Sequence, residues 1–333
     1  MSSPIKVKRH ALWERHMKIM ITSLITEKFQ AELIDEFPDI EFIFENEPER
    51  HINEVSQCDV FMGIPSREVF LAADKIRWLH CPGTGIDKIM EIPEVIDSDV
   101  VVTNARGPHT SPMADHGMAM ILTFAHKLRQ LWDDQKEKIW NLPGYDQQMI
   151  SLAETTMGIL GIGGIGSAMA RRAAAFGIRV YGIDRDVTLS SQGVLEVWGT
   201  DRLDELLSIS DWFVVAVPYT SDTHHLLGHS RMSKLKPGSR IIVLSRGGIV
   251  DESALMEGIE NGRIAGAGLD VTEVEPLPQD SPLWDHPNII LSPHVSALTS
   301  EMWDGRRDIF KENLRRYLSN KPFLHACDKR LGY

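Results

Sequence analysis

Short apolar runs of strand length alternate with amphipathic stretches along most of the chain. In the first third we expect strands near residues 17–23, 40–45, 58–63, 76–81 and 99–103. Amphipathic segments such as ITEKFQAELIDEF separate these runs. Evenly apolar strands that alternate with helices are typical of a parallel sheet covered on both faces. The pattern therefore predicts an α/β domain in this part of the chain.

The pattern changes at residue 112. The segment 112–140 predicts one long helix, with Pro112 in its first turn, where proline is favoured. Its first half is apolar around most of its circumference and rich in methionine at 113–120, which indicates a buried interface and a homodimer. A second alternating series follows, with strands expected near 156–161, 179–183, 212–217, 240–244, 266–270 and 289–291. The segment 299–320 predicts a closing helix.

Two alternating series predict two doubly wound parallel-sheet domains. We expect a first domain formed by 17–111 together with 300–333, because the closing helix returns to it, and a second domain at 112–299. Residues 1–16 are basic and patternless, and we expect an extension outside the fold. A short packed helix through Leu12 and Trp13 is the alternative for this segment.

Length and composition agree with two globular domains. The chain has 333 residues, of which 43% are hydrophobic and 25% charged. A formal net charge of −12 disfavours nucleic acid and anionic membranes as partners. The three cysteines lack metal or redox spacing, and no apolar run approaches the ~20 residues of a membrane span. The N-terminus lacks the apolar stretch of a secretory signal, so we expect a reducing, cytoplasmic location and no membrane association.

A glycine-rich turn follows the strand expected near 156–161. Gly161, Gly163 and Gly166 have the G-x-G-x-x-G spacing, before an alanine-rich helix and a further strand. These glycines permit a tight turn, the approach of a pyrophosphate to the helix N-terminus, and close packing of helix on sheet. Asp184 ends the next strand, where it would accept hydrogen bonds from a ribose and repel a 2′-phosphate. NAD is thus favoured over NADP, although Arg185 could pair with a 2′-phosphate. The alternative is a packing turn beside a surface aspartate.

Three residues near the end of the chain form a candidate catalytic set. Arg246, Glu275 and His294 each lie just after a short apolar run, where a buried strand would end. They combine a cation that can hold an anion, a base that can exchange a proton, and a carboxylate that can tune this base. Each has a structural alternative: an arginine paired with Asp251, a solvated loop glutamate, and a histidine that caps the closing helix.

Several motifs resemble those of the D-isomer-specific 2-hydroxyacid dehydrogenase family. The resemblance runs from about residue 58 to the C-terminus and is most specific between 157 and 298. The motifs that carry it, beside the glycine turn, are VTNARGPHTSPMADH, AVPYTSDTHHLLG, MSKLKPGSRIIVLSRGGIVDESAL, GRIAGAGLDVTEVEPLPQDSPLW and NIILSPHVSALT. It implies an NAD-binding Rossmann domain at 112–299, a flavodoxin-like substrate domain, and an inter-domain cleft that receives the substrate.

The resemblance also implies roles for individual residues. The substrate arginine, tuning carboxylate and catalytic histidine of the family fall on Arg246, Glu275 and His294. Its carboxylate-binding loop resembles CPGTGIDKI, where Thr84 and Gly85 would present amides. Further cofactor contacts are implied at Met113, Gly164, Ile165, Val217, Pro218, Thr223, Ser245 and Asp270, besides Arg246 and His294 themselves. Gly164 departs from the arginine often found there, so backbone amides would hold more of the pyrophosphate.

The expected activity is hydride transfer between NAD(H) and a small 2-keto acid or D-2-hydroxy acid. Glyoxylate and hydroxypyruvate are the first expected substrates, since the motifs look most like the branch of glyoxylate/hydroxypyruvate reductases. The alternative is an NAD-sensing, corepressor-like scaffold of the same fold, and a third hypothesis is a formate or phosphite dehydrogenase. No metal is expected, because His224, His225 and His229 are interpreted as loop residues whose neighbouring side chains point in different directions.

Overall fold

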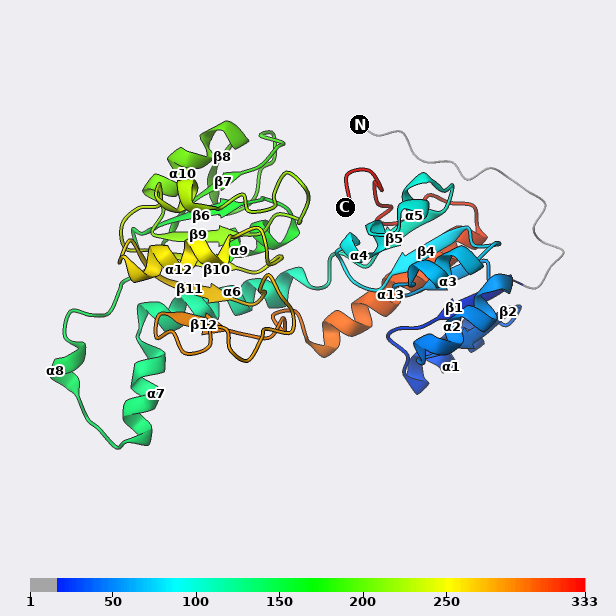
Figure 1. The fold of residues 1–333 in the computed structure, drawn as a ribbon, viewed down its shortest axis with the longest axis horizontal. Helices are drawn as coiled ribbons and strands as arrows, with labels where there is room; N and C mark the ends of the chain where they lie inside the picture. Colours follow the sequence, from blue (N-terminus) through cyan, green and yellow to red (C-terminus); the bar gives the residue numbers. More distant parts are fainter. Residues whose placement is uncertain (1–16, 333) are drawn as a thin grey trace. The chain divides into compact units, whose positions relative to one another are not determined.

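The structure, a computed structural model, describes residues 17–332. The expectations for residues 1–16 lie outside these residues. The described chain divides into two compact units (Figure 1), one formed by 109–298 and the other by the segments before and after it. The predicted fold class, two parallel-sheet α/β domains, is confirmed.

The first unit contains a five-stranded parallel sheet. Its strands are β1 (Met17–Ile21), β2 (Ile40–Phe44), β3 (Val60–Met62), β4 (Trp78–Cys81) and β5 (Val101–Asn104), in the order β2-β1-β3-β4-β5. This is the flavodoxin-like order. The helical segments of the unit are α1 (Glu27–Glu36), α2 (Pro48–Glu54), η1 (Val55–Gln57), α3 (Arg67–Ala72), α4 (Asp87–Met90), α5 (Pro93–Asp97) and α13 (Ser300–Leu318). Helix α13 packs Phe310 and Leu314 beside Trp78, as expected of a closing helix that returns to the first domain.

The second unit contains a seven-stranded parallel sheet. Its strands are β6 (Thr156–Leu160), β7 (Arg179–Ile183), β8 (Val194–Trp198), β9 (Trp212–Val215), β10 (Ser239–Val243), β11 (Ile264–Leu269) and β12 (Ile289–Leu291). The order β12-β11-β10-β9-β6-β7-β8 reverses direction between β6 and β9. Its helical segments are α6 (Thr110–Ala125), α7 (Leu128–Lys136), α8 (Leu142–Tyr145), α9 (Gly164–Ala175), η2 (Thr200–Arg202), α10 (Leu203–Ile209), α11 (His229–Met232) and α12 (Glu252–Glu260).

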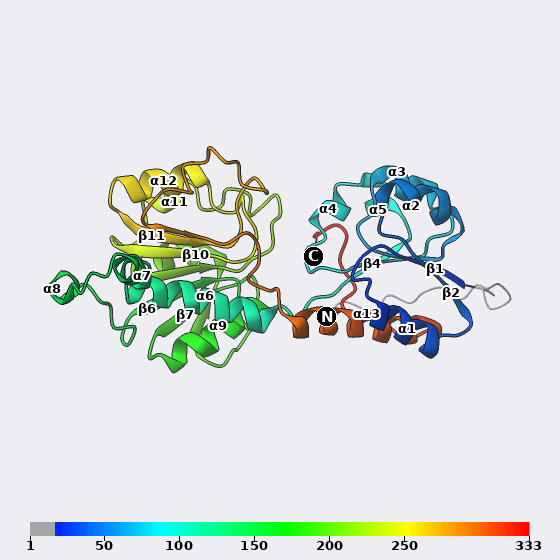
Figure 2. The same ribbon diagram turned by 90° about the horizontal axis from the view of Figure 1, so that it is seen from below.

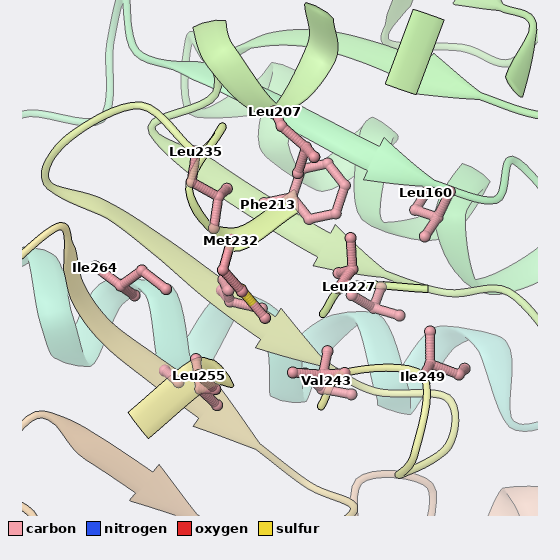
Figure 3. Packing of buried hydrophobic residues seen from close by; sticks show 14 of the residues in the cluster. Leu160, Leu207, Phe213, Leu227, Met232, Leu235, Val243, Ile249, Leu255 and Ile264 are labelled. Atoms are coloured by element: carbon pink, nitrogen blue, oxygen red, sulfur yellow. The ribbon is translucent and has the colours of Figure 1, made fainter. Parts of the chain in front are cut away.

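Each face of this second sheet carries its own hydrophobic core. On one face, Leu207 of α10 and Met232 of α11 cover Phe213 and Val243 of the sheet, and Leu255 of α12 joins the same cluster (Figure 3). On the other face α6 and α9 pack together, as Figure 2 shows from a second direction. Because both faces are covered, the inner strands β6, β9, β10 and β11 are buried along nearly their whole length.

Three sequence expectations need correction. The long helix expected at 112–140 is broken, because Lys127 adopts a left-handed conformation (φ 55°) between α6 and α7. The methionine-rich stretch packs inside its own unit, where Met118 and Met120 are 4% exposed, so it supplies no argument for a dimer. Strand β8 was not predicted, since most of its residues are exposed or half-buried and it lacks an evenly apolar run.

Candidate active site

The candidate site residues of the second unit lie at one edge of its sheet. All seven strands are parallel, so their carboxyl ends meet there. This edge at the reversal of strand order is where doubly wound sheets bind ligands. Along this edge the glycine turn follows β6, Asp184 follows β7, Val217 and Pro218 follow β9, Ser245 and Arg246 follow β10, Asp270 and Glu275 follow β11, and His294 follows β12.

The glycine turn fits a dinucleotide pyrophosphate. Gly161 has φ 95°, and a Cβ atom there would lie 2.8 Å from Val217 Cγ1. A Cβ on Gly166 would lie 1.9 Å from the carbonyl oxygen of Gly161, so close packing of α9 requires glycine. Gly163, by contrast, has nothing within 4 Å of its would-be Cβ among the described residues, and Gly164 begins α9. The open side of the turn therefore presents the helix N-terminus to a ligand.

Asp184 is attached to this turn by its side chain. Its Oδ2 accepts a hydrogen bond from the backbone N–H of Ile162 at 2.9 Å, and its Oδ1 accepts one from Asp186 N–H at 3.1 Å. The neighbouring Arg185 forms an ion pair with Asp222, with 2.9 Å between Nη2 and Oδ2. The Asp184 carboxylate is thus fixed next to the turn that would hold the pyrophosphate, whereas the side chain of Arg185 is paired with Asp222.

His294 and Glu275 are in direct contact. Nδ1 of His294 lies 2.9 Å from Oε2 of Glu275, and the two side chains are 45% and 40% exposed. The other carboxylate oxygen, Oε1, accepts a longer hydrogen bond of 3.3 Å from the N–H of Thr272. With Nδ1 engaged by the carboxylate, Nε2 is the nitrogen left to exchange a proton with a substrate.

The loop that carries His294 is fixed by Asp270, which is 1% exposed. One oxygen of this carboxylate accepts hydrogen bonds from Ser292 Oγ at 2.6 Å and from Val295 N–H at 2.9 Å. His294 itself has φ 56°, and its N–H donates to the carbonyl oxygen of Asp270 at 2.7 Å. His116 of α6 adds a contact of 2.9 Å between Nε2 and Ser292 Oγ. This anchoring of the His294 loop was not predicted, because the residues that form it lie far apart in the sequence, as His116 and Ser292 do at a separation of 176 residues.

Arg246 begins the loop after β10, and this loop touches the one that carries Glu275. Nη1 of Arg246 donates to the carbonyl oxygen of Ser245 at 2.9 Å. A Cβ on Gly247 would lie 1.9 Å from the carbonyl oxygen of Thr272, so the two backbones are in contact and glycine is required. The positions of Arg246 and Glu275 are therefore coupled through their loops.

Glu252 and Glu273 connect the same loops a second time. The N–H of Glu252 donates to Glu273 Oε1 at 2.9 Å, and the N–H of Glu273 donates to Glu252 Oε1 at 2.7 Å. His225 Nε2 lies 3.1 Å from the same Oε1 of Glu273. Burial raises the pKa of the Glu252 carboxyl, and its hydrogen bond from Glu273 N–H works against this rise. This pairing was not predicted, since no local pattern distinguishes Glu252 and Glu273 from ordinary surface acids.

The remaining predicted contacts occupy varied positions. Thr84 and Gly85 lie in the other unit, in the loop after β4, where Asn104 Nδ2 donates to the carbonyl oxygen of Thr84 at 2.6 Å. Met113 is 7% exposed in α6 and belongs to the core cluster of that face. Thr223 Oγ1 donates to the carbonyl oxygen of Pro218 at 2.8 Å and so closes the loop after β9.

The rings of His224 and His225 stack with 4.0 Å between their centroids, so the expectation that these neighbouring side chains point in different directions is wrong. His225 contacts Glu273, His229 Nδ1 lies 2.7 Å from Glu257 Oε2, and His224 Nδ1 lies 3.1 Å from Tyr219 Oη. Within residues 17–332, no group of three or more His, Cys, Asp or Glu side chains is arranged to hold a metal ion. Over the same residues, no helix has the length and apolar character that crossing a membrane requires.

The sheet order, the glycine turn and the acid after β7 define a dinucleotide-binding domain of the Rossmann type. Residues 118–296 match the profile described as the NAD binding domain of D-isomer specific 2-hydroxyacid dehydrogenases. This match covers more than half of the chain, which therefore belongs to the D-isomer specific 2-hydroxyacid dehydrogenase family. The resemblance found in the sequence motifs is thereby confirmed, as is NAD as the cofactor of the matched domain.

Three proteins are similar to this chain over most of its length. A D-3-phosphoglycerate dehydrogenase from Bacillus subtilis is 40% identical over 263 residues, which are 79% of this chain and 49% of that protein. A glyoxylate reductase from Korarchaeum cryptofilum is 33% identical over 272 residues, 79% of this chain and 80% of that protein. The crystal structure of an NADPH-dependent glyoxylate/hydroxypyruvate reductase from Sinorhizobium meliloti, in complex with NADP and sulfate, superposes with a TM-score of 0.83 at 27% identity, covering 95% of this chain and 100% of that one.

The chain spans about half the length of the phosphoglycerate dehydrogenase from Bacillus subtilis and most of the length of the glyoxylate reductase. Both relatives bear names of oxidoreductases that act on small hydroxy or keto acids. Neither comparison supports the alternative of a scaffold without catalysis.

Proposed function

We propose that this chain is an NAD-dependent D-2-hydroxyacid dehydrogenase that reduces a small 2-keto acid, with glyoxylate or hydroxypyruvate as the first candidates. The observation that supports this most is the contact of 2.9 Å between His294 and Glu275, at the same sheet edge as Arg246 and the glycine turn. A proton donor, an oxyanion clamp and a nucleotide turn at one edge are the groups that a keto acid reduction needs.

In the proposed mechanism, Arg246 binds the carboxylate and carbonyl oxygens of the substrate. Its planar guanidinium can donate two parallel hydrogen bonds and stays charged at any working pH. When bound, NADH supplies the hydride that reaches the carbonyl carbon. His294 gives the proton on Nε2 to the carbonyl oxygen, while Glu275 holds Nδ1 and stabilises the imidazolium. Such general-acid help is worth about 10²–10⁴-fold in rate.

We propose further that the unit formed by 109–298 binds the cofactor and the other unit contributes to substrate binding. We assign the same roles to the domains expected from the sequence: substrate binding to 17–111 with 300–333, and cofactor binding to 112–299. In the substrate domain the backbone amides of Thr84 and Gly85 would hold the substrate carboxylate. The two units follow the sheet orders of a flavodoxin-like and a Rossmann domain, which favours this division of roles.

NAD rather than NADP is the proposed cofactor. Asp184 is held at the glycine turn by Ile162, so its charge would lie where the ribose hydroxyls bind and would repel a 2′-phosphate. Arg185, the residue that could reverse this preference, pairs with Asp222. The remaining proposed contacts, Met113, Ile165, Val217, Pro218, Thr223, Ser245 and Asp270, follow the family resemblance.

We also propose a cytoplasmic homodimer. The three cysteines are buried and form no disulfide, which suits a reducing compartment. Support for the dimer comes from α7, α8 and the segments beside them, where Trp132, Ile139, Trp140, Leu142 and Met149 are exposed, Trp140 at 93%. Monomers rarely expose so many large apolar side chains along one segment.

Steady-state kinetics test the proposal. The purified chain is assayed with glyoxylate, hydroxypyruvate, pyruvate and a bulky aryl pyruvate, each with NADH and NADPH. We expect turnover of at least one small keto acid, a preference for NADH, and a loss of about 10²–10⁴-fold in kcat in His294→Ala. Near-normal turnover in that variant would overturn the assignment of His294. Binding of NADH without turnover of any keto acid would instead favour the scaffold.

A further inference from the structure

A cavity lies in the proposed cofactor unit, at the sheet edge opposite the candidate active site. It is formed where α6 ends and α7 begins, beside the amino ends of β10, β11 and β12. Its volume is about 30 Å³, far below that of sites for drug-sized ligands, so it can take only a small group. The residues that line it are Thr123, Phe124, Lys127, Arg129, Gln130, Arg240, Ala265, Pro287, Asn288 and Ile290.

Arg240 is the central group of this cavity. Its guanidinium carbon lies 5.2 Å from the ring centroid of Trp212 and 5.9 Å from that of Phe124, so two aromatic rings hold the cation in place. Its Nη1 donates a long hydrogen bond of 3.4 Å to the carbonyl oxygen of Gly238. Burial lowers the pKa of the guanidinium, an effect that Asp211 opposes.

Two buried donors lack an acceptor within the described chain, one on Arg240 of the cavity lining and one on Trp212, the ring that Arg240 contacts. Among residues 17–332, neither Nε of Arg240 nor Nε1 of Trp212 has a hydrogen-bond partner. The nearby acid, Asp211, is already bound to Lys236 Nζ at 2.6 Å and to the N–H of Thr156 at 2.9 Å. Buried N–H groups in native proteins are almost always paired, so an orphaned pair indicates an acceptor that the chain does not supply.

The charges of the residues that line the cavity also indicate an anionic ligand. Lys127 and Arg129 line it together with Arg240, and none of its described lining residues is acidic. Arg129 uses one donor on the carbonyl oxygen of Ile289 at 2.9 Å and has others left. Three cations around one cavity are unexpected on a chain with a net charge of −12 unless an anion compensates them.

We propose that this cavity binds a small oxyanion, either inorganic phosphate or the phosphate or carboxylate group of a small metabolite. Arg240 and Lys127 supply the charge, Thr123, Gln130 and Asn288 supply neutral polar groups, and Phe124 forms one wall. The anion binds at the amino edge of the sheet, whereas the glycine turn lies at the carboxyl edge. The two sites therefore do not compete for one ligand.

The position of this anion site also connects it to the candidate active site. Strands β10, β11 and β12 begin at the cavity and end at the loops that carry Arg246, Glu275 and His294. An anion that fixes the amino ends of these strands stabilises the frame on which all three residues are mounted. Stabilisation of the folded unit follows from binding alone, because any ligand of the native state raises its free energy of unfolding.

Phosphate binding to the full chain tests the site. Heat of binding and thermal unfolding are measured with phosphate replacing chloride at constant ionic strength, with saturating NADH so that the glycine turn is occupied. We expect saturable binding and a rise in Tm in the unsubstituted chain. Arg240→Met keeps the apolar stem but removes the donors, and its affinity for phosphate should fall by about tenfold or more, since hydrogen bonds from charged groups are involved. Repetition with acetate then shows whether a carboxylate suffices.

Arg202→Met is the matched control, because Arg202 also stacks on a tryptophan, 3.7 Å from the ring centroid of Trp198, but is not one of the residues that line this cavity. It should bind phosphate as the unsubstituted chain does. Lys127→Gln, at the rim, gives a second test if Arg240→Met proves unstable, and it too should weaken binding. Equal phosphate binding by Arg240→Met, Lys127→Gln and the unsubstituted chain would overturn the proposal, because phosphate bound elsewhere, for example at Arg246, would be unaffected by these substitutions. The absence of saturable binding would overturn it as well.

Discussion

Nδ1 of His294 lies 2.9 Å from Oε2 of Glu275, in the loops that follow two neighbouring strands, β12 and β11. The carboxylate thereby sets the orientation of the imidazole and leaves Nε2 as the nitrogen available to a ligand. Asp270 supports this geometry as well, since its backbone and side chain together bind the loop on both sides of His294. His294, the proposed proton donor, is therefore positioned by two acids: Glu275 binds its ring and Asp270 binds its backbone.

Glu275→Gln separates the charge of this acid from its shape. The amide oxygen can still accept the hydrogen bond from Nδ1, but the negative charge that stabilises the imidazolium is lost. We expect kcat for keto acid reduction to fall by about 10–100-fold, with KM for NADH changed little. Steady-state assays at neutral pH measure both constants. Asp280→Asn, in the same proline-rich loop, is the control and should retain full activity.

Arg246→Lys tests whether the fork of the guanidinium matters beyond its charge. An ammonium keeps the positive charge but cannot donate two parallel hydrogen bonds to a keto acid. KM for the keto acid should rise by roughly tenfold or more and kcat should fall as well, because a bidentate charged contact is lost. Arg263→Lys, on the opposite sheet edge, should leave both constants unchanged. Unaltered kinetics in Arg246→Lys would remove Arg246 from the substrate site.

Asp184→Asn tests the proposed basis of cofactor choice. Asparagine can still accept the hydrogen bond from Ile162 N–H, so the glycine turn is preserved while the charge is removed. The ratio of kcat/KM for NADH over NADPH should fall by about tenfold, because the negative charge that repels the 2′-phosphate of NADPH is gone. Asp186→Asn, two residues further on and also at the end of this strand, is the matched control. A ratio that stays constant in Asp184→Asn would contradict the proposal.

Much of this architecture could be predicted from the sequence because buried parallel strands have an unambiguous pattern. Strands β7 and β12 match the expected ranges 179–183 and 289–291 at both ends. The carboxyl ends of β6, β7, β10, β11 and β12 then place the glycine turn, Asp184 and the three candidate catalytic residues at one sheet edge. Strand β8 could not be found in this way, because only Trp198 of its five residues is buried.

Other features depend on contacts that no local pattern encodes. Lys127 breaks the helix expected at 112–140 with a left-handed backbone, and a lysine gives no warning of this conformation. Asp270 was predicted as a cofactor contact from the family resemblance, yet its carboxylate is also surrounded by the loop of His294. The reciprocal pair of Glu252 and Glu273 joins residues 21 apart that both look like solvated acids.

This reciprocal pair leads to a prediction for Glu273 as a positioning residue. Glu273→Ala removes the acceptor of Glu252 N–H and of His225, so the loop that carries Glu275 loses one attachment. We expect kcat to fall by roughly 3–10-fold with KM for NADH unchanged, in line with the loss of one or two hydrogen bonds. Glu273→Gln should restore most of the activity, because its amide oxygen can accept the same bond. Glu257→Ala, which removes an exposed partner of His229, is the control and should be neutral.

His80 predicts a pH dependence of stability in the other unit. This side chain is 0% exposed, its Nδ1 lies 2.8 Å from Thr103 Oγ1, and burial lowers its pKa to about 3. An unfolded histidine titrates near 6.5, so between about pH 6.5 and 3 the unfolded state binds the extra proton and stability falls as the pH falls. Between pH 7.5 and 5.5 the contribution of His80 is about 1.4 kcal/mol, since one pKa unit corresponds to about 1.4 kcal/mol.

Denaturant unfolding at pH 7.5 and 5.5 measures this contribution against His80→Phe, which has no titrating group. The variant should lose less stability than the unsubstituted chain on acidification, by about 1 kcal/mol, whatever its stability at pH 7.5. His126→Phe is the control, because it makes the same substitution at an exposed position at the end of α6 and leaves His80 in place. An identical pH dependence in His80→Phe and the unsubstituted chain would show that His80 is protonated in the folded protein, contrary to its burial among Trp78, Thr103 and Phe310.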